Sequence, residues 1–120
     1  MPFSIRLCVL AAILTGAACG SSPTATPADT FGGSATATSV DVSMPGSRYA
    51  PNHIDIAQGG VVQFIFPAEA HDVRFNNAAG APSDVLAATN STVARTFANK
   101  GTFPFLCTLH DNMTGTVIVH

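Results

Sequence analysis

Short runs of alternating apolar and polar residues constrain the fold of this chain more than any other feature. The run VDVSM places Val40, Val42 and Met44 on one face of an extended strand, and VVQFIF does the same with Val62 and Phe64. Glycine, proline and asparagine separate these runs, and no segment keeps a helical period over the length of a normal helix. The pattern predicts an all-β fold, an antiparallel β-sandwich or barrel.

The second half of the chain continues this pattern after a long connection of small and polar residues. One helical turn is expected within that connection, near residues 84–88. The run GTFPFLC then places Phe103, Phe105 and Cys107 on one face of a strand. Pro104 lies in the middle of this strand and lacks a backbone N–H, so we expect it at a sheet edge or a bulge.

The first 18 residues have the composition of an export signal. Arg6 supplies a positive charge, an unbroken apolar run of eight residues follows from Leu7 to Leu14, and small residues lead to Cys19. This run is too short for a transmembrane helix, which needs roughly 20 apolar residues. Residues 16–19 resemble the cleavage site of bacterial lipoproteins, in which the cysteine becomes lipidated, although Gly16 stands where leucine is usual. Ordinary cleavage after Ala18 is the alternative.

A Ser/Thr/Pro/Gly-rich segment follows at residues 19–38, and its composition predicts a flexible tether. A tether directly after Cys19 favours the lipoprotein interpretation. Residues 39–120 are therefore expected to form the folded domain. The chain is expected to be exported, to the periplasm or the outer cell surface, with membrane attachment through Cys19.

Cysteine and charge counts narrow the function further. The chain has 120 residues and three cysteines, of which only Cys107 lies in the predicted domain, so no internal disulfide can form there. A lone thiol in an oxidising compartment is a liability unless it is buried or bound to a metal. Without the signal segment, four basic residues remain against seven acidic ones, a net charge of −3. This negative net charge makes nucleic acid an unsuitable partner.

Four donor residues stand at predicted strand ends. Cys107, His110 and Met113 share the turn in CTLHDNM, and His71 follows an earlier buried strand. Two imidazoles, a thiolate and a weak thioether suit copper in both oxidation states, whereas structural zinc sites prefer paired cysteines. Each residue alone could be core filling or a surface loop residue. The four together favour a metal site.

The chain resembles the cupredoxins, the type 1 (blue) copper proteins, and is similar to the plastocyanin and amicyanin group. The family pattern is a glycine, alternating aromatics, a cysteine, then histidine, methionine and glycine; it is matched by Gly101, Phe103, Phe105, Cys107, His110, Met113 and Gly115. The two-residue gaps between the last three donors are similar to those of amicyanin. The resemblance covers residues 39–120 and implies an antiparallel Greek-key β-sandwich.

The same resemblance implies one copper ion held by His71, Cys107 and His110, with Met113 as the axial ligand. His110 would be the more exposed imidazole and the route for electrons to a partner. Asp72 stands where the family usually has asparagine, and an ionised carboxylate can accept a hydrogen bond from Thr108 but cannot donate one. Its negative charge should favour Cu(II).

Two further departures concern the residues around this pattern. Leu109 replaces a frequent proline and should make the ligand loop less rigid. His53 and His120 lie outside the pattern; a solvated position is expected for His53 and a frayed end for His120.

Four functions can be compared on these grounds. A monomeric, membrane-tethered electron carrier without catalytic residues, docking redox partners near His110, fits best. A copper carrier or delivery protein is the alternative, and it would lack the visible band of a thiolate site. A multicopper oxidase or nitrite reductase needs additional copper sites and additional domains, and a chain of this length is too short to form them. In a metal-free adhesion module Cys107 would not be a ligand, so Cys107→Ser would cause no loss of copper binding.

Overall fold

The structure is a computed structural model in which residues 30–120 are described. This part of the chain forms nine strands and no helix: β1 Phe31–Gly33, β2 Ser39–Ser43, β3 His53–Ile56, β4 Val61–Phe66, β5 His71–Val73, β6 Val85–Ala88, β7 Ser91–Thr96, β8 Gly101–Leu106 and β9 Thr114–Val119. No segment within it could cross a bilayer as a helix.

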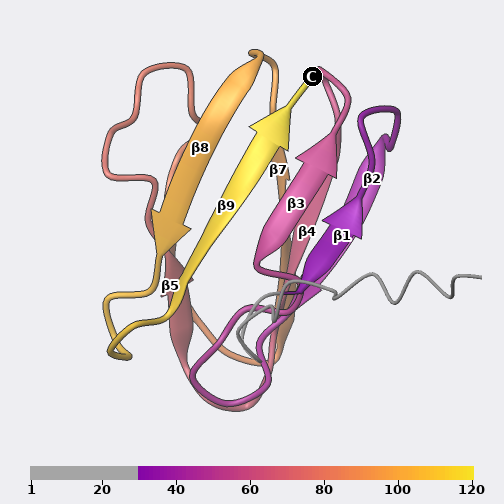
Figure 1. Ribbon diagram of the computed structural model, residues 1–120. Coiled ribbons are helices and arrows are strands. Elements are labelled where there is room, and N and C mark those ends of the chain that lie inside the picture. Colours follow the sequence, from indigo (N-terminus) through magenta and orange to yellow (C-terminus); the bar gives the residue numbers. More distant parts are fainter. Residues whose placement is uncertain (1–29) are drawn as a thin grey trace, which may run out of the picture.

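Two main sheets face each other and form the sandwich. One has the strand order β1-β3-β9-β8, and the other has the order β2-β4-β7. In Figure 1 the four-stranded sheet lies in front of the three-stranded one. Strands β5 and β6 form a separate two-stranded sheet beside them. The predicted all-β sandwich is confirmed.

Strand pairing is mixed rather than antiparallel throughout. The β4–β7, β5–β6 and β8–β9 pairs are antiparallel, as expected. The β1–β3, β2–β4 and β3–β9 pairs are parallel. Parallel neighbours require a crossover between the sheets rather than a hairpin, because a tight turn can only join antiparallel strands.

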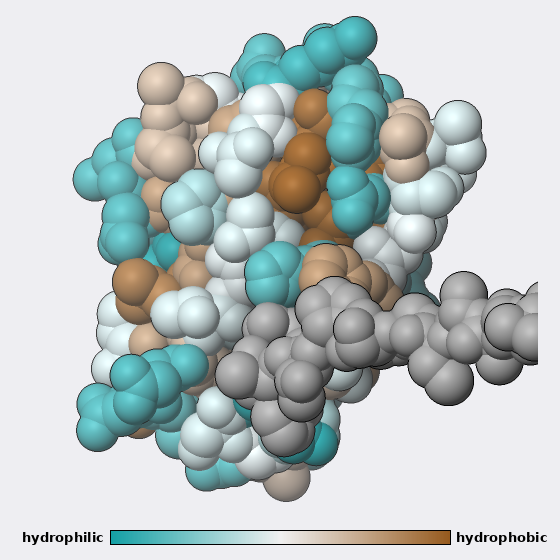
Figure 2. Space-filling view, in the orientation of Figure 1, coloured by the Kyte–Doolittle hydropathy of each residue, from teal (hydrophilic) through white to brown (hydrophobic). Residues whose placement is uncertain are grey.

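The core lies between the two sheets and follows the predicted alternation. Val42 of β2, Ile54 of β3 and Phe64 of β4 are fully buried, and the burial pattern of each strand alternates around them. On the face shown in Figure 2, hydrophobic residues gather mainly near the upper centre. The sandwich thus buries one face of each main sheet and leaves the other in contact with solvent, where Ile65 of β4 is 38% exposed.

The folded part begins earlier than expected. Phe31–Gly33 pairs with β3, and the Ala37 carbonyl accepts a hydrogen bond from the backbone of Ala57. The prediction of a flexible tether is therefore wrong for Phe31–Gly33, which pairs with β3, and for Ala37 and Thr38, whose carbonyls accept hydrogen bonds from the backbone of Ala57 and Val61. The signal segment 1–18, the lipidation site Cys19 and the tether up to residue 29 lie outside the described residues.

Two other local expectations are settled by strand pairing. The expected helical turn near residues 84–88 is wrong, because Val85–Ala88 forms β6 and pairs with β5. Pro104 does lie at a sheet edge, as expected, since β8 is the outermost strand of its sheet. At an edge, the missing backbone N–H of Pro104 costs the sheet no hydrogen bond between strands.

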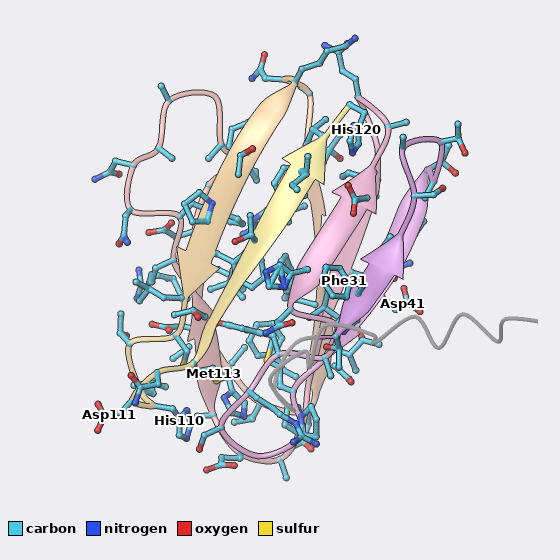
Figure 3. The ribbon with its side chains drawn as sticks, viewed as in Figure 1. Phe31, Asp41, His110, Asp111, Met113 and His120 are labelled. Atoms are coloured by element: carbon cyan, nitrogen blue, oxygen red, sulfur yellow. The ribbon has the colours of Figure 1, made fainter. Side chains whose placement is uncertain are left out.

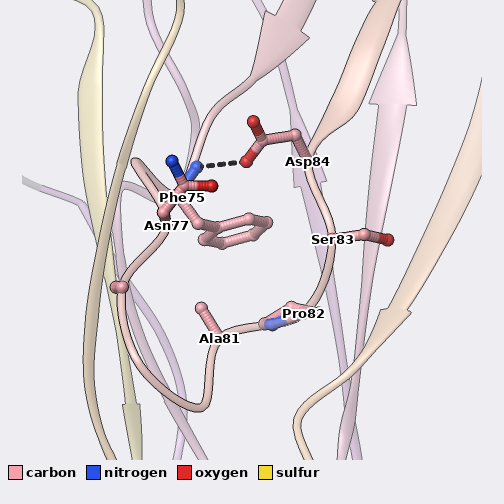
Figure 4. Close-up of a pocket in the computed structure, with 7 residues that line it drawn as sticks. Phe75, Asn77, Ala81, Pro82, Ser83 and Asp84 are labelled. Carbon is pink, nitrogen blue, oxygen red and sulfur yellow. Dashed lines mark hydrogen bonds between the residues drawn. The ribbon is translucent and has the colours of Figure 1, made fainter.

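A cavity of about 390 Å³ lies under the loop that joins β5 to β6. Phe75 and Asp84 line it, and the Asp84 carboxylate accepts a hydrogen bond from the Phe75 backbone at 2.8 Å (Figure 4). None of the four predicted metal ligands lines this cavity.

Candidate metal centre

The predicted ligands come from two strand ends that the fold ties together. His71 begins β5, and Cys107 directly follows β8. Arg74 and Leu106, which flank these strand ends, exchange two backbone hydrogen bonds of 2.8 and 3.0 Å. This bridge brings His71 to the same end of the sandwich as the loop of residues 107–113, as expected from the sequence.

Three donors lie within reach of one ion. The ligand atoms of His71, Cys107 and His110 all lie within 4.8 Å of one another. Cys107 Sγ is 3.6 Å from His110 Nδ1, and the two imidazole rings are 4.6 Å apart between centroids. His71 and Cys107 are buried, whereas 17% of the His110 side chain is exposed. His110 is therefore the more exposed imidazole, as predicted.

Met113 completes the loop at the same end of the molecule. The Cys107 backbone N–H donates to the Met113 carbonyl at 2.9 Å, which closes the ligand loop on itself. The Met113 side chain is buried, and Figure 3 shows it near His110 at the lower end of the molecule. A buried thioether beside two imidazoles and a thiol is the donor set of a copper site with a weak axial ligand.

His71 provides the strongest sign that this donor set fits a metal. Its side chain is fully buried, and neither ring nitrogen has a hydrogen-bond partner among the described residues. Buried polar groups almost always have a partner, so an unpaired imidazole calls for an explanation. Burial, reinforced by His110, lowers the pKa of His71 and outweighs Glu69 and Asp72. The ring is thereby kept neutral, which is the form that binds a metal.

The predicted contact between Asp72 and Thr108 is present. The Asp72 carboxylate accepts hydrogen bonds from the Thr108 backbone at 2.7 Å and from the Thr108 hydroxyl at 2.5 Å. Arg74 donates to the same carboxylate at 2.9 Å. Burial alone would raise the pKa of Asp72, but the hydrogen bonds from Thr108 and then Arg74 outweigh burial and lower it. Asp72 is thus an anion that fixes the start of the ligand loop.

The ligand loop also supplies a donor to the cysteine sulfur. The Leu109 backbone N–H lies 3.4 Å from Cys107 Sγ. The Leu109 side chain is 50% exposed beside His110. The loop therefore keeps a fixed hydrogen bond to the sulfur although it lacks the proline that is frequent at this position.

Sequence reasoning missed three residues at this end of the fold: Tyr49, Glu69 and Arg74. The buried Tyr49 hydroxyl donates to the Asp72 carbonyl at 2.6 Å. Burial, then the charges of Cys107 and Asp72, raise the pKa of Tyr49 far above its ordinary range, so it remains a neutral donor. Glu69 lies against His110 and Arg74 against Asp72. Only the nearness of Glu69 and Arg74 to His71 in the chain could have suggested them.

The two other histidines lie away from the ligands. His53 is half-buried in β3 and stacks on Phe31 with ring centroids 5.0 Å apart, so its expected solvated position is only partly right. The His120 imidazole lies 2.6 Å from the Asp55 carboxylate, and its backbone is bonded to Ile56. The expected fraying of His120 is therefore wrong. In Figure 3, His120 lies at the opposite end from His110.

Comparisons with known proteins agree with this description. A family profile for the cupredoxin-like domain matches residues 6–119. Amicyanin from Paracoccus versutus is similar in structure, with a TM-score of 0.61, 24% identity and coverage of 72% of this chain and 89% of amicyanin. A mutant amicyanin in its reduced Cu(I) form at pH 4 gives a TM-score of 0.60 and 24% identity, with 72% and 90% covered.

A larger enzyme also contains the fold. The copper-containing nitrite reductase from Thermus scotoductus SA-01 matches 68% of this chain with a TM-score of 0.59 and 24% identity. The match spans only 22% of the nitrite reductase. The comparison with curated protein sequences found no significant match. The family match over nearly the whole length, together with the sandwich and its donor cluster, shows that the chain belongs to the cupredoxin-like domain family.

Proposed function

We propose that this protein is a one-electron carrier with a type 1 copper site held by His71, Cys107, His110 and Met113. The observation that carries the proposal is the buried, unpaired imidazole of His71 within reach of Cys107 and His110. A bound copper ion would supply the Cu(II)/Cu(I) couple. One electron would be accepted from a reduced partner protein and passed to an oxidised one, with no bond made or broken.

The surrounding residues support this role by holding the donors in place. The Arg74–Leu106 bridge connects the two ligand-bearing segments, and Asp72 binds both the backbone and the hydroxyl of Thr108. A site whose donors hardly move between two oxidation states loses little energy to rearrangement. The partly exposed edge of His110 supports docking of redox partners there, with Leu109 as a neighbouring apolar contact.

Export, membrane attachment and the monomeric state belong to the same proposal. The apolar segment before Cys19 supports an exported, lipid-anchored protein in the periplasm or on the outer cell surface. Mass spectrometry of the protein purified from membranes tests the anchor. A mature N-terminus at a lipidated Cys19 is expected, and an unmodified Cys19 would overturn it.

The electron-carrier role is distinguished from copper delivery by redox cycling. The copper-loaded protein is reduced and reoxidised repeatedly in the presence of a Cu(I) chelator. We expect one electron per protein in every cycle, with the copper retained by its four buried or half-buried donors. Transfer of the copper to the chelator on first reduction would contradict the electron-carrier role and support delivery.

A further inference from the structure

Glu69 lies against the outer side of the donor cluster. It belongs to the turn between β4 and β5, and 56% of its side chain is exposed. Its Oε1 atom is 3.0 Å from His110 Nε2, and its Oε2 atom is 4.0 Å from His71 Nε2. One carboxylate thus hydrogen-bonds the outer nitrogen of His110 and faces the outer nitrogen of His71.

This contact defines which nitrogen of His110 carries the proton. A carboxylate can only accept, so the hydrogen bond requires a proton on Nε2. In the neutral ring, Nδ1 then keeps its lone pair, and Nδ1 is the atom that lies 3.6 Å from Cys107 Sγ. Glu69 therefore holds His110 in the tautomer and orientation that present a free donor to the metal site.

We propose that Glu69 is a positioning residue for His110 and, through that ring, tunes the metal site. The inference rests on the proposed function for its effect on copper, but the contact itself needs no metal. A carboxylate that accepts from the second nitrogen of a ligating histidine fixes the ring and raises its basicity. A more basic imidazole favours Cu(II) over Cu(I), so Glu69 should stabilise the oxidised state.

Three variants separate this role from a general effect of charge. Glu69→Ala removes the acceptor, while Glu69→Gln keeps an acceptor oxygen and removes the charge. Asp111→Asn is the matched control, because Asp111 is an exposed carboxylate next to His110 in the chain, whereas the carboxylate bonded to His110 is that of Glu69. All three variants change surface side chains, so they should fold normally.

The first measurement is proton NMR of the metal-free protein near pH 8, above the ordinary pKa of histidine of about 6.5. An exposed ring N–H exchanges rapidly with water, whereas one bonded to a carboxylate gives a downfield resonance. His120 should give a second resonance of this kind, because its imidazole lies 2.6 Å from the Asp55 carboxylate, and the variant His120→Ala identifies that resonance by its loss. We expect the resonance of His110 in the native protein, Glu69→Gln and Asp111→Asn, and its loss in Glu69→Ala. Persistence of the His110 resonance in Glu69→Ala, or its absence from the native protein, would overturn the assignment.

The second measurement is the affinity for Cu(II) and Cu(I). We expect Glu69→Ala to lose about ten-fold in Cu(II) affinity, the lower end of the usual effect of such partners, with a smaller change for Cu(I). Asp111→Asn should leave both affinities unchanged. Equal losses in Glu69→Ala and Asp111→Asn would overturn the tuning role. A colourless copper-loaded native protein would instead contradict the type 1 site. The NMR measurement on the metal-free protein would still test the hydrogen bond between Glu69 and His110 independently.

Discussion

His71 combines complete burial with two unpaired ring nitrogens among the described residues, which makes the metal-free protein sensitive to pH. Burial, then His110, lowers the pKa of His71 in the folded state below its ordinary value of 6.5. Between these two pKa values the unfolded chain binds the extra proton, so the free energy of unfolding falls as pH falls below 6.5. One proton gives a slope of at most about 1.4 kcal/mol per pH unit.

Denaturant unfolding of the metal-free protein at about pH 7.5 and about pH 5.5, on either side of the ordinary histidine pKa, measures this loss. We expect a clear fall in stability for the native protein and a smaller fall for His71→Gln. An equal fall in the two proteins would show that His71 does not govern the acid sensitivity.

Asp72 and Arg74 are an ion pair that sets the charge beside the ligand loop. The Asp72 anion lies beside the ligand loop and is partly neutralised by Arg74 at 2.9 Å. Negative charge near the metal favours Cu(II). We therefore expect Asp72→Asn to raise the reduction potential and Arg74→Gln to lower it, as measured by redox titration. Shifts in the same direction would contradict this account.

The same pair should also affect stability. Asp72→Asn leaves Arg74 without its closest anion and weakens the hydrogen bonds that Thr108 donates. A cost of about 1–3 kcal/mol in the free energy of unfolding is typical when partners are lost in this way.

The positions of the four proposed ligands could be predicted from the sequence because their spacing and strand phase are local properties. Asp72 was also identified, since it follows His71 directly. The contacts that Glu69 and Tyr49 make could not be predicted, because they depend on how separate turns fold back on the site. Side-chain partners across 23 or 41 residues leave no periodic signal in the chain.

At the scale of elements, Gly115 shows how closely β8 and β9 are fitted. It lies opposite Phe105 in the β8–β9 ladder, and the Phe105 ring occupies the space that a Cβ atom would need. We expect Gly115→Ala to destabilise the protein by about 1–3 kcal/mol, as overpacking usually does.

Thermal unfolding compares this variant with Thr114→Ala, an exposed substitution in the same strand. The control should change the melting temperature little. Equal melting temperatures for Gly115→Ala and the native protein would mean that Phe105 moves aside without cost.

Strands that are long and strictly alternating could be predicted, and β2, β4 and β8 are the clear cases. The short strand β1 could not, because its Phe-Gly-Gly sequence has no alternation and it forms only by pairing with β3. The same holds for β6, whose VLAA sequence also suits a helix and becomes a strand by pairing with β5. Parallel pairing likewise follows from the crossovers, which local patterns do not encode.

At the scale of the whole molecule, the sandwich places all four donor residues at one end. It gathers the ends of β4, β5 and β8 at one end, where a loop of seven residues, 107–113, carries three of the four donors. The opposite end, with His120, contributes none of them. The site is therefore produced by topology acting on two short segments, and the remaining strands support it.

The visible spectrum of the copper-loaded protein tests this account most directly. The native protein, Cys107→Ser and the control His120→Ala are each loaded with one equivalent of Cu(II). We expect an intense thiolate-to-copper band in the native protein and in His120→Ala, and its loss in Cys107→Ser. A native protein that binds Cu(II) without this band, or a Cys107→Ser variant that keeps it, would contradict the account.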